Sequence, residues 1–479
     1  MSTPRTTHLP TLMGALMSAC ISCSAHAGWQ ASDLDKLTSS FTAGISRAYG
    51  VTASPWQFLS CDASSTNCFG TNPDSPYSSP DFGASAANAH SSSTKMKALD
   101  ALVVIMETPP TMRYFGLTPY IITRYYPSAV TGSAATPGFV PVFESLGDTA
   151  NLRDMGTTGS STAGSNAFSQ LSVSVMTADQ QTAKDVKAQL IGLGFPSSAI
   201  NLMAMPINAV PLHMGQAPTS DTYSILLRMA YPQYTWQMKD YISRAPLRVL
   251  SLTPLQATRA AQNLPTPVSR VPGSQPAEST TLADARDALI EQLKAQFKAS
   301  YDITRSPAPQ MQTQNYVCVT HALPCNGDNP DAIYSGDVQG LTPTSKQDRI
   351  LIVGVNHVSQ GKATYLSHAI VAHANNMGVK GVSDTWLAGT GLKAAGITDP
   401  SDPRYATYSQ LYAFTLSYDC GNDPLCVTIP EVATADQPYT IPFGQALDIT
   451  GRVYLDPQTN TRPSTNDIIT HKVFIMQKH

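Results

Sequence analysis

Residues 318–335 read CVTHALPCNGDNPDAIYS, and residues 61–78 read CDASSTNCFGTNPDSPYS. Both stretches fit the pattern C-x6-C-x-G-x-N-P-D-x-x-Y, with seven identical positions at one offset of 257 residues. Agreement at residue types as infrequent as Cys and Tyr is far beyond what composition produces by chance. The repeat predicts an internal duplication, in which two similar lobes share a cleft at their junction.

The first 27 residues have the pattern of a secretory signal peptide. Arg5 precedes an apolar and small-residue run from Leu9 to Cys23, and an A-x-A cleavage site follows at 25–27. The apolar run is too short to span a bilayer, so no transmembrane anchor is expected. A poor lipoprotein signal ending at Cys20 is the alternative. The sequence therefore predicts a secreted or periplasmic protein.

Removal of residues 1–27 leaves six cysteines arranged as three close pairs. An oxidising compartment favours disulfides, and the repeated spacing favours local pairing. A zinc site made of cysteines would need C-x2-C spacing, which is absent once residues 1–27 are removed. The predicted disulfides are Cys61–Cys68, Cys318–Cys325 and Cys420–Cys426.

The composition limits the class of partner. Charged residues make up 13% of the chain, against about 25% in a typical globular protein, and the net charge is -3. A chain with this charge and without Lys/Arg clusters is not expected to bind nucleic acid. We expect a small-molecule or polymer substrate instead.

Periodicity predicts an α+β, strand-rich architecture. Apolar spacing of three and four predicts helices over 31–48, 183–193 and 282–297, the last one capped by Thr281. Short apolar or alternating runs predict strands over 101–106, 113–122, 171–176, 201–207, 350–355, 362–370 and 411–416. Strand 171–176, helix 183–193 and strand 201–207 form a β-α-β unit.

These elements divide into two pseudo-repeated, sandwich-like lobes with a few covering helices. The first lobe spans 28–250 and begins with the first helix. A linker rich in Pro, Ser and Thr, followed by a helix, spans 251–300, and the second lobe spans 301–479.

The repeated motif is followed by an apolar strand, a proline and then Arg-Tyr-Phe. This order resembles the signature of the bacterial domain-of-unknown-function family 1254, which pairs an N-x-D-x-x-Y-S element with a P…R-Y-Y-S segment. The matching residues are Asn72, Asp74, Tyr77, Ser78, Pro110, Arg113, Tyr114 and Phe115, and in the second lobe Asn329, Asp331, Tyr334 and Ser335. The second lobe departs from the signature, because His357, Lys362, Thr364 and Tyr365 stand where an R-Y-Y element is expected. The resemblance covers about a quarter of the chain. It implies secreted, β-rich lobes and no particular reaction.

The repeated Asn-Pro-Asp-x-x-Tyr block has three interpretations. Asn before Pro starts a turn, Asp accepts backbone N–H bonds and Tyr anchors the loop, so the block fits a structural role. Alternatively, Asp74 and Asp331 face one cleft and divide acid and base roles. The third interpretation is a structural calcium site formed by Asp328, Asn329 and Asp331.

His357 is the strongest single candidate for chemistry, because it follows an apolar strand and precedes a Gly-bearing loop. His is the side chain best suited to proton transfer near neutral pH. In this hypothesis His357 is the general base, and Asp331 or Asp384 orients it. Charge would be stabilised by Lys362, Arg113 or Tyr365. The reaction class expected from this set is hydrolysis.

Other chemistries have little support. His368 and His373 are five residues apart and are not expected to chelate one metal, and the sequence has no H-E-x-x-H, P-loop, G-x-G-x-x-G or G-x-S-x-G motif. No organic cofactor is therefore predicted.

The alternative function is non-catalytic binding. Aromatic side chains with a few polar groups suit a groove for a small molecule or carbohydrate. The residues expected to line such a groove are Tyr77, Tyr114, Phe115 and Tyr334, with Asp74 beside them.

Overall fold

A computed structural model describes residues 29–59, 61, 65, 67–83, 91–127, 138–256, 259–266, 268–273, 276–307, 310–311 and 316–479. The predicted signal peptide lies outside these residues. We refer to residues 29–256 as the first half of the chain and to residues 276–479 as the second half.

The first half contains two sheets. One has the order β1 (Tyr49–Ser54), β12 (Leu247–Pro254), β4 (Ala101–Glu107), β9 (Leu171–Thr177) and β10 (Ile200–Ala204). The other has the order β2 (Trp56–Phe58), β3 (Tyr77–Pro80), β11 (Thr222–Pro232), β5 (Met112–Tyr126) and β6 (Gly138–Val140), and the short strands β7 (Glu144–Ser145) and β8 (Ala150–Asn151) also pair with β5.

The second half contains two sheets with the same orders. One runs β13 (Tyr301–Arg305), β22 (Lys472–Lys478), β16 (Arg349–Val355), β19 (Leu411–Ser417) and β20 (Cys426–Thr428). The other runs β14 (Gln310–Met311), β15 (Ala332–Leu341), β21 (Leu447–Tyr454), β17 (Tyr365–Ala372) and β18 (Met377–Ser383). In both halves the last two strands of the first sheet are parallel and its other neighbours are antiparallel. This correspondence is what the duplicated motif predicts.

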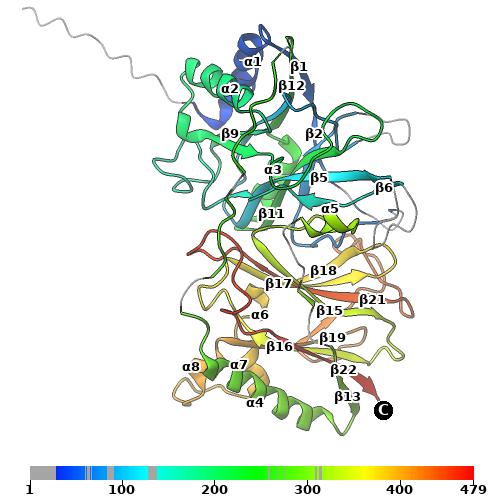
Figure 1. Cartoon of the computed structure of the whole chain (residues 1–479). Helices are drawn as coiled ribbons and strands as arrows, with labels where there is room; N and C mark the ends of the chain where they lie inside the picture. Colours follow the sequence, from blue (N-terminus) through cyan, green and yellow to red (C-terminus); the bar gives the residue numbers. More distant parts are fainter. Residues whose placement is uncertain are drawn as a thin grey trace, which may run out of the picture.

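Helices cover the outer face of the first sheet in each half. The helices that cover the first half are α1 (Leu34–Ile45) and α2 (Gln180–Gly192). Those that cover the second half are α4 (Thr280–Phe297), α7 (Thr390–Ala395) and α8 (Tyr405–Tyr408). The remaining helices are α3 (Thr235–Arg244), α5 (Val317–His321), α6 (Asp384–Leu387) and the short 3-10 helices Ala31–Asp33 and Ser197–Ala199. Figure 1 shows the resulting stack of layers, with α1 and α2 at one end and α4, α7 and α8 at the other.

The amphipathic patterns explain this arrangement. Leu34, Leu37, Phe41 and Ile45 are the buried face of α1, at the spacing predicted from the sequence. In β4, alternate residues face opposite cores: Leu102 and Val104 pack between the two sheets of the first half, and Ala101 and Val103 pack under the helices. A strand buried on both faces therefore reads as a continuous apolar run.

The predicted α+β, strand-rich class is confirmed, and so are the three disulfides, which join Cys61 to Cys68, Cys318 to Cys325 and Cys420 to Cys426. The β-α-β unit is present as β9, α2 and the parallel strand β10. The expected cap of α4 is corrected: Ser279 is the N-cap, and its hydroxyl accepts the N–H of Thr281 at 3.3 Å. The division into domains at residues 250 and 300 stays a prediction.

Candidate functional site at the junction of the two halves

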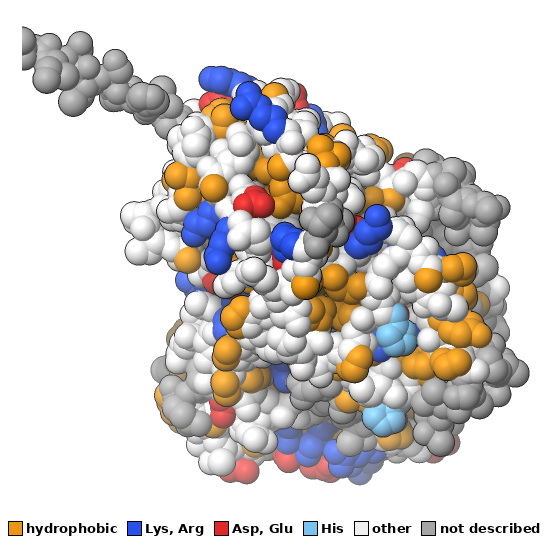
Figure 2. Space-filling view, turned by 45° about the horizontal axis from the view of Figure 1, so that its top comes forward, with side chains coloured by type: hydrophobic (Ala, Val, Ile, Leu, Met, Phe, Trp, Pro, Cys, Tyr) orange, Lys and Arg blue, Asp and Glu red, His pale blue; other side chains and the backbone are white. Residues whose placement is uncertain are grey.

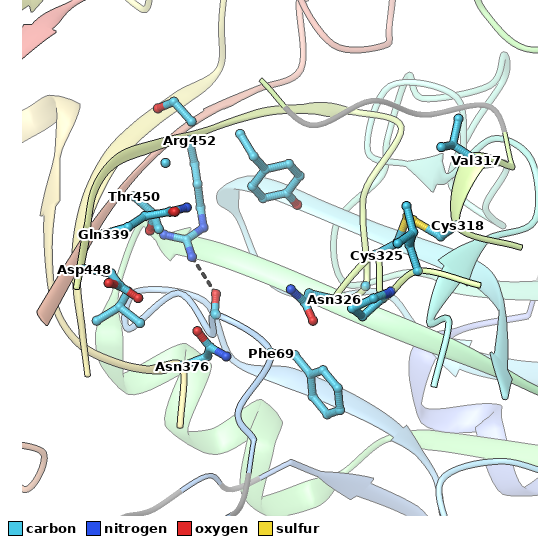
Figure 3. A pocket seen from close by; sticks show the side chains of 18 residues that line it. Phe69, Val317, Cys318, Cys325, Asn326, Gln339, Asn376, Asp448, Thr450 and Arg452 are labelled. Atoms are coloured by element: carbon cyan, nitrogen blue, oxygen red, sulfur yellow. Dashed lines mark hydrogen bonds between the residues drawn. A yellow bond between two sulfur atoms is a disulfide. The ribbon is translucent and has the colours of Figure 1, made fainter. Parts of the chain in front are cut away.

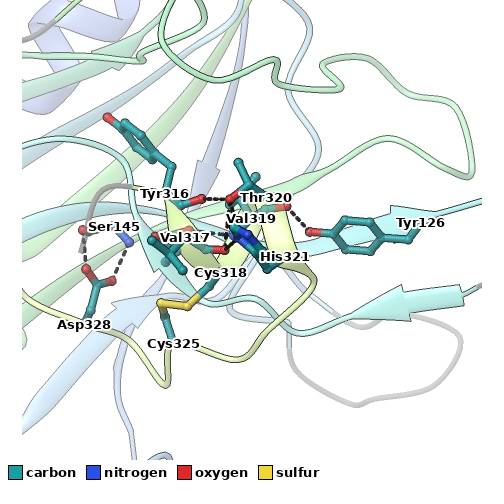
Figure 4. Close-up of a disulfide and its surroundings, with 11 residues drawn as sticks. Tyr126, Ser145, Tyr316, Val317, Cys318, Val319, Thr320, His321, Cys325 and Asp328 are labelled. Atoms are coloured by element: carbon teal, nitrogen blue, oxygen red, sulfur yellow. Dashed lines mark hydrogen bonds between the residues drawn. A yellow bond between two sulfur atoms is a disulfide. The ribbon is translucent and has the colours of Figure 1, made fainter. Parts of the chain in front are cut away.

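The second copy of the repeated motif docks on the first half of the chain. Backbone N–H groups of Cys325 and Gly327 donate to the carbonyls of Val142 (2.8 Å) and Phe143 (2.9 Å). Asn329 Nδ2 donates to the Tyr114 hydroxyl at 2.8 Å, and that hydroxyl donates to Asp331 Oδ2 at 3.1 Å. Figure 4 shows the Cys318–Cys325 disulfide at the base of this loop, beside strands of the first half.

The first copy makes the reciprocal contacts with the second half. Cys68 and Gly70 donate their N–H groups to the carbonyls of Asn375 (2.6 Å) and Asn376 (2.9 Å). Asn72 Nδ2 donates to the Tyr365 hydroxyl at 3.2 Å, and this hydroxyl donates to Asp74 Oδ2 at 3.3 Å. Each motif thus binds a tyrosine of the opposite half through the same Asn and Asp positions. We call these reciprocal contacts the clasp.

Two buried arginines complete the clasp at corresponding strands. Arg228 on β11 donates to the carbonyl of Gly327, and Arg452 on β21 donates to the carbonyl of Gly70 at 2.5 Å. Between the halves the clasp encloses an aromatic cluster that contains Tyr114, Tyr365 and Tyr454. The ring centroid of Tyr454 lies 4.8 Å from that of Tyr114 and 5.6 Å from that of Tyr365. The structural interpretation of the Asn-Pro-Asp block therefore accounts for every contact described so far.

The carboxylates of the two motifs bind separate partners instead of each other. Asp74 bonds Tyr365, whereas Asp331 bonds Tyr114 and also accepts from Asn151 Nδ2 at 2.9 Å. Burial raises the pKa of Asp331 to about 7, against the opposing effect of Arg270, and burial also raises the pKa of Asp74.

The residues of the predicted calcium site point to different partners. Asp328 accepts the N–H and hydroxyl of Ser145 at 2.7 Å and 2.8 Å (Figure 4), and Asn329 Oδ1 accepts the Thr149 hydroxyl at 3.1 Å. Asp331 binds Tyr114 as described above. Because a calcium ion needs converging oxygen ligands, these contacts favour a structural role for the three side chains.

A cavity of about 390 Å³ opens beside the clasp, between the two motif loops (Figure 3). The first motif contributes Phe69 and Gly70, and the second contributes its disulfide and Tyr334. Strands β15 and β21 and the turn before β18 supply polar side chains, which are Gln339, Asn376, Asp448, Thr450 and Arg452. We call this cavity the groove.

Two polar groups that line the groove have no hydrogen-bond partner, namely Arg452 Nη1 and Thr450 Oγ1, both fully enclosed. Arg452 is 3% exposed, and its charge acts on the nearby Asp74, where it opposes the effect of burial on the pKa of that carboxyl. By contrast, Asp448 is occupied, because it accepts the N–H of Gly340 at 2.6 Å and lies 2.9 Å from His373 Nδ1. Buried polar atoms without hydrogen-bond partners are costly, so Arg452 Nη1 and Thr450 Oγ1 mark a place for a hydrogen-bond acceptor.

The aromatic residues predicted to line a groove are placed differently from one another. Tyr334 lines it, and Tyr77 lies at its own motif, where its hydroxyl accepts the N–H of Asn72 at 3.2 Å. Tyr114 is in the clasp, and Phe115 is in the core between the two sheets of the first half. Phe69, which the sequence analysis leaves out, lines the groove instead.

His357 follows β16 and is enclosed. Its Nδ1 lies 2.7 Å from Glu278 Oε1, with side chains 2% and 1% exposed, and the other Glu278 oxygen accepts the N–H of Ile469 at 2.6 Å. The carboxylate at His357 thus belongs to Glu278, and the assignment to Asp331 or Asp384 is corrected. Glu278 lies in the segment read as linker, where a single acidic residue carries no recognisable pattern.

The other residues of the predicted catalytic set lie apart. Tyr365 is in the clasp, and Asp384 faces the half-exposed Arg113 at 3.8 Å, with a pKa raised by burial. Lys362 follows the His357 turn, where its backbone N–H donates to the His357 carbonyl at 2.9 Å. The structure brings together a His and a carboxylate, but encloses both.

The surface seen in Figure 2 is mostly uncharged, with Lys, Arg, Asp and Glu scattered over it, in keeping with the 13% of charged residues. Within the described residues, no helix combines the length and apolarity needed to cross a bilayer.

No protein-family model and no curated protein matches the chain. Structure comparison finds an uncharacterised protein from Burkholderia cenocepacia at 10% identity and a TM-score of 0.38, covering 94% of this chain and 87% of that one. A protein from Vibrio parahaemolyticus has 9% identity and a TM-score of 0.35, covering 93% and 96%. At these scores neither similarity supports a statement about function. The resemblance to family 1254 stays a prediction.

Proposed function

We propose that this protein is an exported, non-catalytic binding protein that holds a small anionic molecule in the groove between its halves. The observation that carries the proposal is the pair of unpartnered groups, Arg452 Nη1 and Thr450 Oγ1, on the wall of the groove. A carboxylate that reaches both groups would accept a hydrogen bond from each and would add to the charge interaction between Arg452 and Asp74. The three disulfides support an exported location, because such bonds persist in oxidising compartments.

The lining of the groove suggests the class of ligand. Its volume of about 390 Å³ lies in the range of small-molecule sites. Phe69 and Tyr334 offer aromatic surface, and the amides of Gln339 and Asn376 offer hydrogen bonds to hydroxyl groups. A hydroxy acid or an acidic sugar combines these features.

The hydrolase hypothesis stays a prediction with less support. The His357–Glu278 pair has the 2.7 Å separation expected of an acid–base dyad, but a general base must reach its substrate, and both side chains are enclosed. The groove is a partly open cavity whose lining includes the charged residues Arg452 and Asp448.

The test is a thermal-shift screen of the mature protein against hydroxy acids, uronic acids and matched neutral sugars, followed by calorimetric titration of the hits. We expect carboxylates to bind and their neutral counterparts not to bind. The variant Arg452→Gln should weaken binding about ten-fold or more, because a charge-assisted hydrogen bond is lost. The control Arg349→Gln removes an arginine of β16 that does not line the groove, and it should bind like the wild type.

A second variant separates binding from stability. Thr450→Val removes an unpaired buried hydroxyl, which should leave the melting temperature unchanged or slightly higher while weakening binding. The absence of carboxylate binding, or equal affinity in wild type and folded Thr450→Val and Arg452→Gln, would overturn the proposal.

A further inference from the structure

A buried cluster of two histidines and one carboxylate lies between the two sheets of the second half. Asp337 comes from β15, His368 from β17, and His471 immediately precedes β22. Asp337 Oδ1 is 2.7 Å from His471 Nε2, and Asp337 Oδ2 is 3.2 Å from His368 Nδ1. The three donor atoms all lie within 4.8 Å of one another.

The fold itself does not require Asp337 and His368, because the first half has apolar residues at the positions that correspond to these two. Asp337 follows Tyr334 by three residues, as Pro80 follows Tyr77. His368 likewise follows Tyr365 by three, as Leu117 follows Tyr114. The strand partners agree as well: His368 pairs with Gly451, and Leu117 pairs with Leu227.

Neighbouring strands leave room for the cluster. A methyl group at Gly451 would lie only 3.2 Å from Asp337 Oδ2 and 3.2 Å from His471 Cε1, and one at Gly354 would lie 2.8 Å from His471 Cβ. Glycine within a strand often marks such a close approach. The second ring nitrogen of His368 is fixed by the Tyr412 hydroxyl at 2.8 Å, the kind of contact that orients a metal-ligating histidine.

We propose that Asp337, His368 and His471 bind a divalent metal ion of the zinc type. Two imidazole nitrogens and one carboxylate form a donor set that zinc accepts, with a fourth position left for a small ligand. Tetrahedral ligands at usual zinc distances stand about 3.3 Å apart, which is compatible with donor atoms that all lie within 4.8 Å of one another. The Asp337 residue also contributes to the wall of a cavity of about 350 Å³ beside Gly336 and Gln339, although its carboxylate is enclosed.

The other group of suitable donors, Glu144 with Cys318 and Cys325, does not compete, because the two sulfurs form a disulfide. The bound ion would join β15, β17 and the segment before β22, so it would stabilise the second half of the chain. This inference is independent of the groove, since none of its three ligands lines the groove.

The test is calorimetric titration of chelator-treated full-length mature protein with Zn²⁺, with Co²⁺ absorption as a spectroscopic readout. We expect one ion per chain, a higher melting temperature with Zn²⁺, and cobalt bands typical of nitrogen and oxygen ligation. The variant His368→Leu installs the residue of the first half and should lose binding. In the control His373→Leu, a 52% exposed histidine is removed, and binding should persist.

If His368→Leu does not fold, the variant Asp337→Asn tests the site instead, because it keeps the shape of the side chain and removes the one anionic ligand. We expect its affinity for Zn²⁺ to be at least a hundred-fold lower than that of the wild type. The absence of stoichiometric Zn²⁺ binding by the wild type would overturn the proposal. So would unchanged affinity in either folded variant.

Discussion

Asp331 is a clasp residue whose charge state depends on pH near neutrality. It is fully buried, its Oδ1 has no hydrogen-bond partner, and burial raises its pKa to about 7. A carboxyl with a higher pKa in the folded chain binds more protons in the folded state than in the unfolded one. The free energy of unfolding therefore falls as the pH rises from about 4 to about 7.

The variant Asp331→Asn should remove this contribution. Between pH 5 and pH 7 the wild type should lose stability more steeply than the variant, by up to about 1.4 kcal/mol per pH unit, the slope of one proton. Burial also raises the pKa of Glu144 to about 7. Glu144 is present in both proteins and likewise lowers the free energy of unfolding as the pH rises, so the variant keeps part of the pH dependence. Urea unfolding at several pH values measures both slopes; parallel slopes would contradict the pKa assigned to Asp331.

The variant His357→Ala should destabilise the protein. Removal of the imidazole leaves the enclosed Glu278 carboxylate without its partner, which typically costs about 3 kcal/mol or more. His357→Gln can still donate to Glu278 and is the control with a smaller expected loss. Denaturant unfolding provides the measurement, and an unchanged midpoint in His357→Ala would show that the pair has no stabilising role.

At this scale the sequence predicts residue types better than their partners. Asn72, Asp74, Asn329 and Asp331 are identifiable because the motif repeats, but their tyrosine partners lie 215 to 293 positions away in the chain. Glu278 is missed for the same reason. Side-chain pairing across such separations depends on the assembled sheets, which no local pattern encodes.

The elements that meet at the junction are the two motif loops, and the groove is lined by Phe69 and Gly70 of the first and by the disulfide of the second. Cys318 and Cys325 form part of its wall, whereas the third disulfide, Cys420–Cys426, closes a loop beside β20. The three loops close over separations of seven, seven and six residues. They therefore restrict the unfolded chain by similar amounts.

Removal of each disulfide should separate stability from binding. The double variants Cys318→Ala/Cys325→Ala and Cys420→Ala/Cys426→Ala should each lose about 2 kcal/mol of stability. Only the first should also weaken carboxylate binding, because it loosens the wall of the groove. Thermal unfolding and calorimetric titration of both variants make the comparison. Equal binding in the two would place the ligand elsewhere.

Apolar runs explain which elements are predictable. Ala101–Glu107 and Arg349–Val355 are buried on both faces and read as strands without ambiguity. No strand is predicted over Thr222–Pro232 or Leu447–Tyr454, although these strands carry Arg228 and Arg452. A buried arginine interrupts the apolar pattern of its strand, so the feature that builds the junction also conceals the element from prediction.

The whole molecule is a stack in which the inner sheets of the two halves face each other across the clasp (Figure 1). Because each motif loop is bonded to the opposite half, neither half keeps its full set of hydrogen bonds when the other unfolds. The repeat predicts two related halves, in line with their matching strand orders, but it does not predict this exchange of loops, since the motif alone does not state which half it binds.

The reciprocal contacts predict one cooperative unfolding transition. Differential scanning calorimetry of the wild type should give a single peak, with calorimetric and van't Hoff enthalpies in agreement. The double variant Tyr114→Phe/Tyr365→Phe removes both clasp hydroxyls and should lower the melting temperature and broaden or split the peak. Two resolved transitions in the wild type would contradict the coupling.

The most direct test of the central claim is a crystal structure of the protein with the tightest-binding carboxylate from the screen. The account predicts density in the groove, with the carboxylate within hydrogen-bond distance of Arg452 Nη1 and Thr450 Oγ1. A ligand bound elsewhere, for example beside His357 in an opened second half, would contradict it.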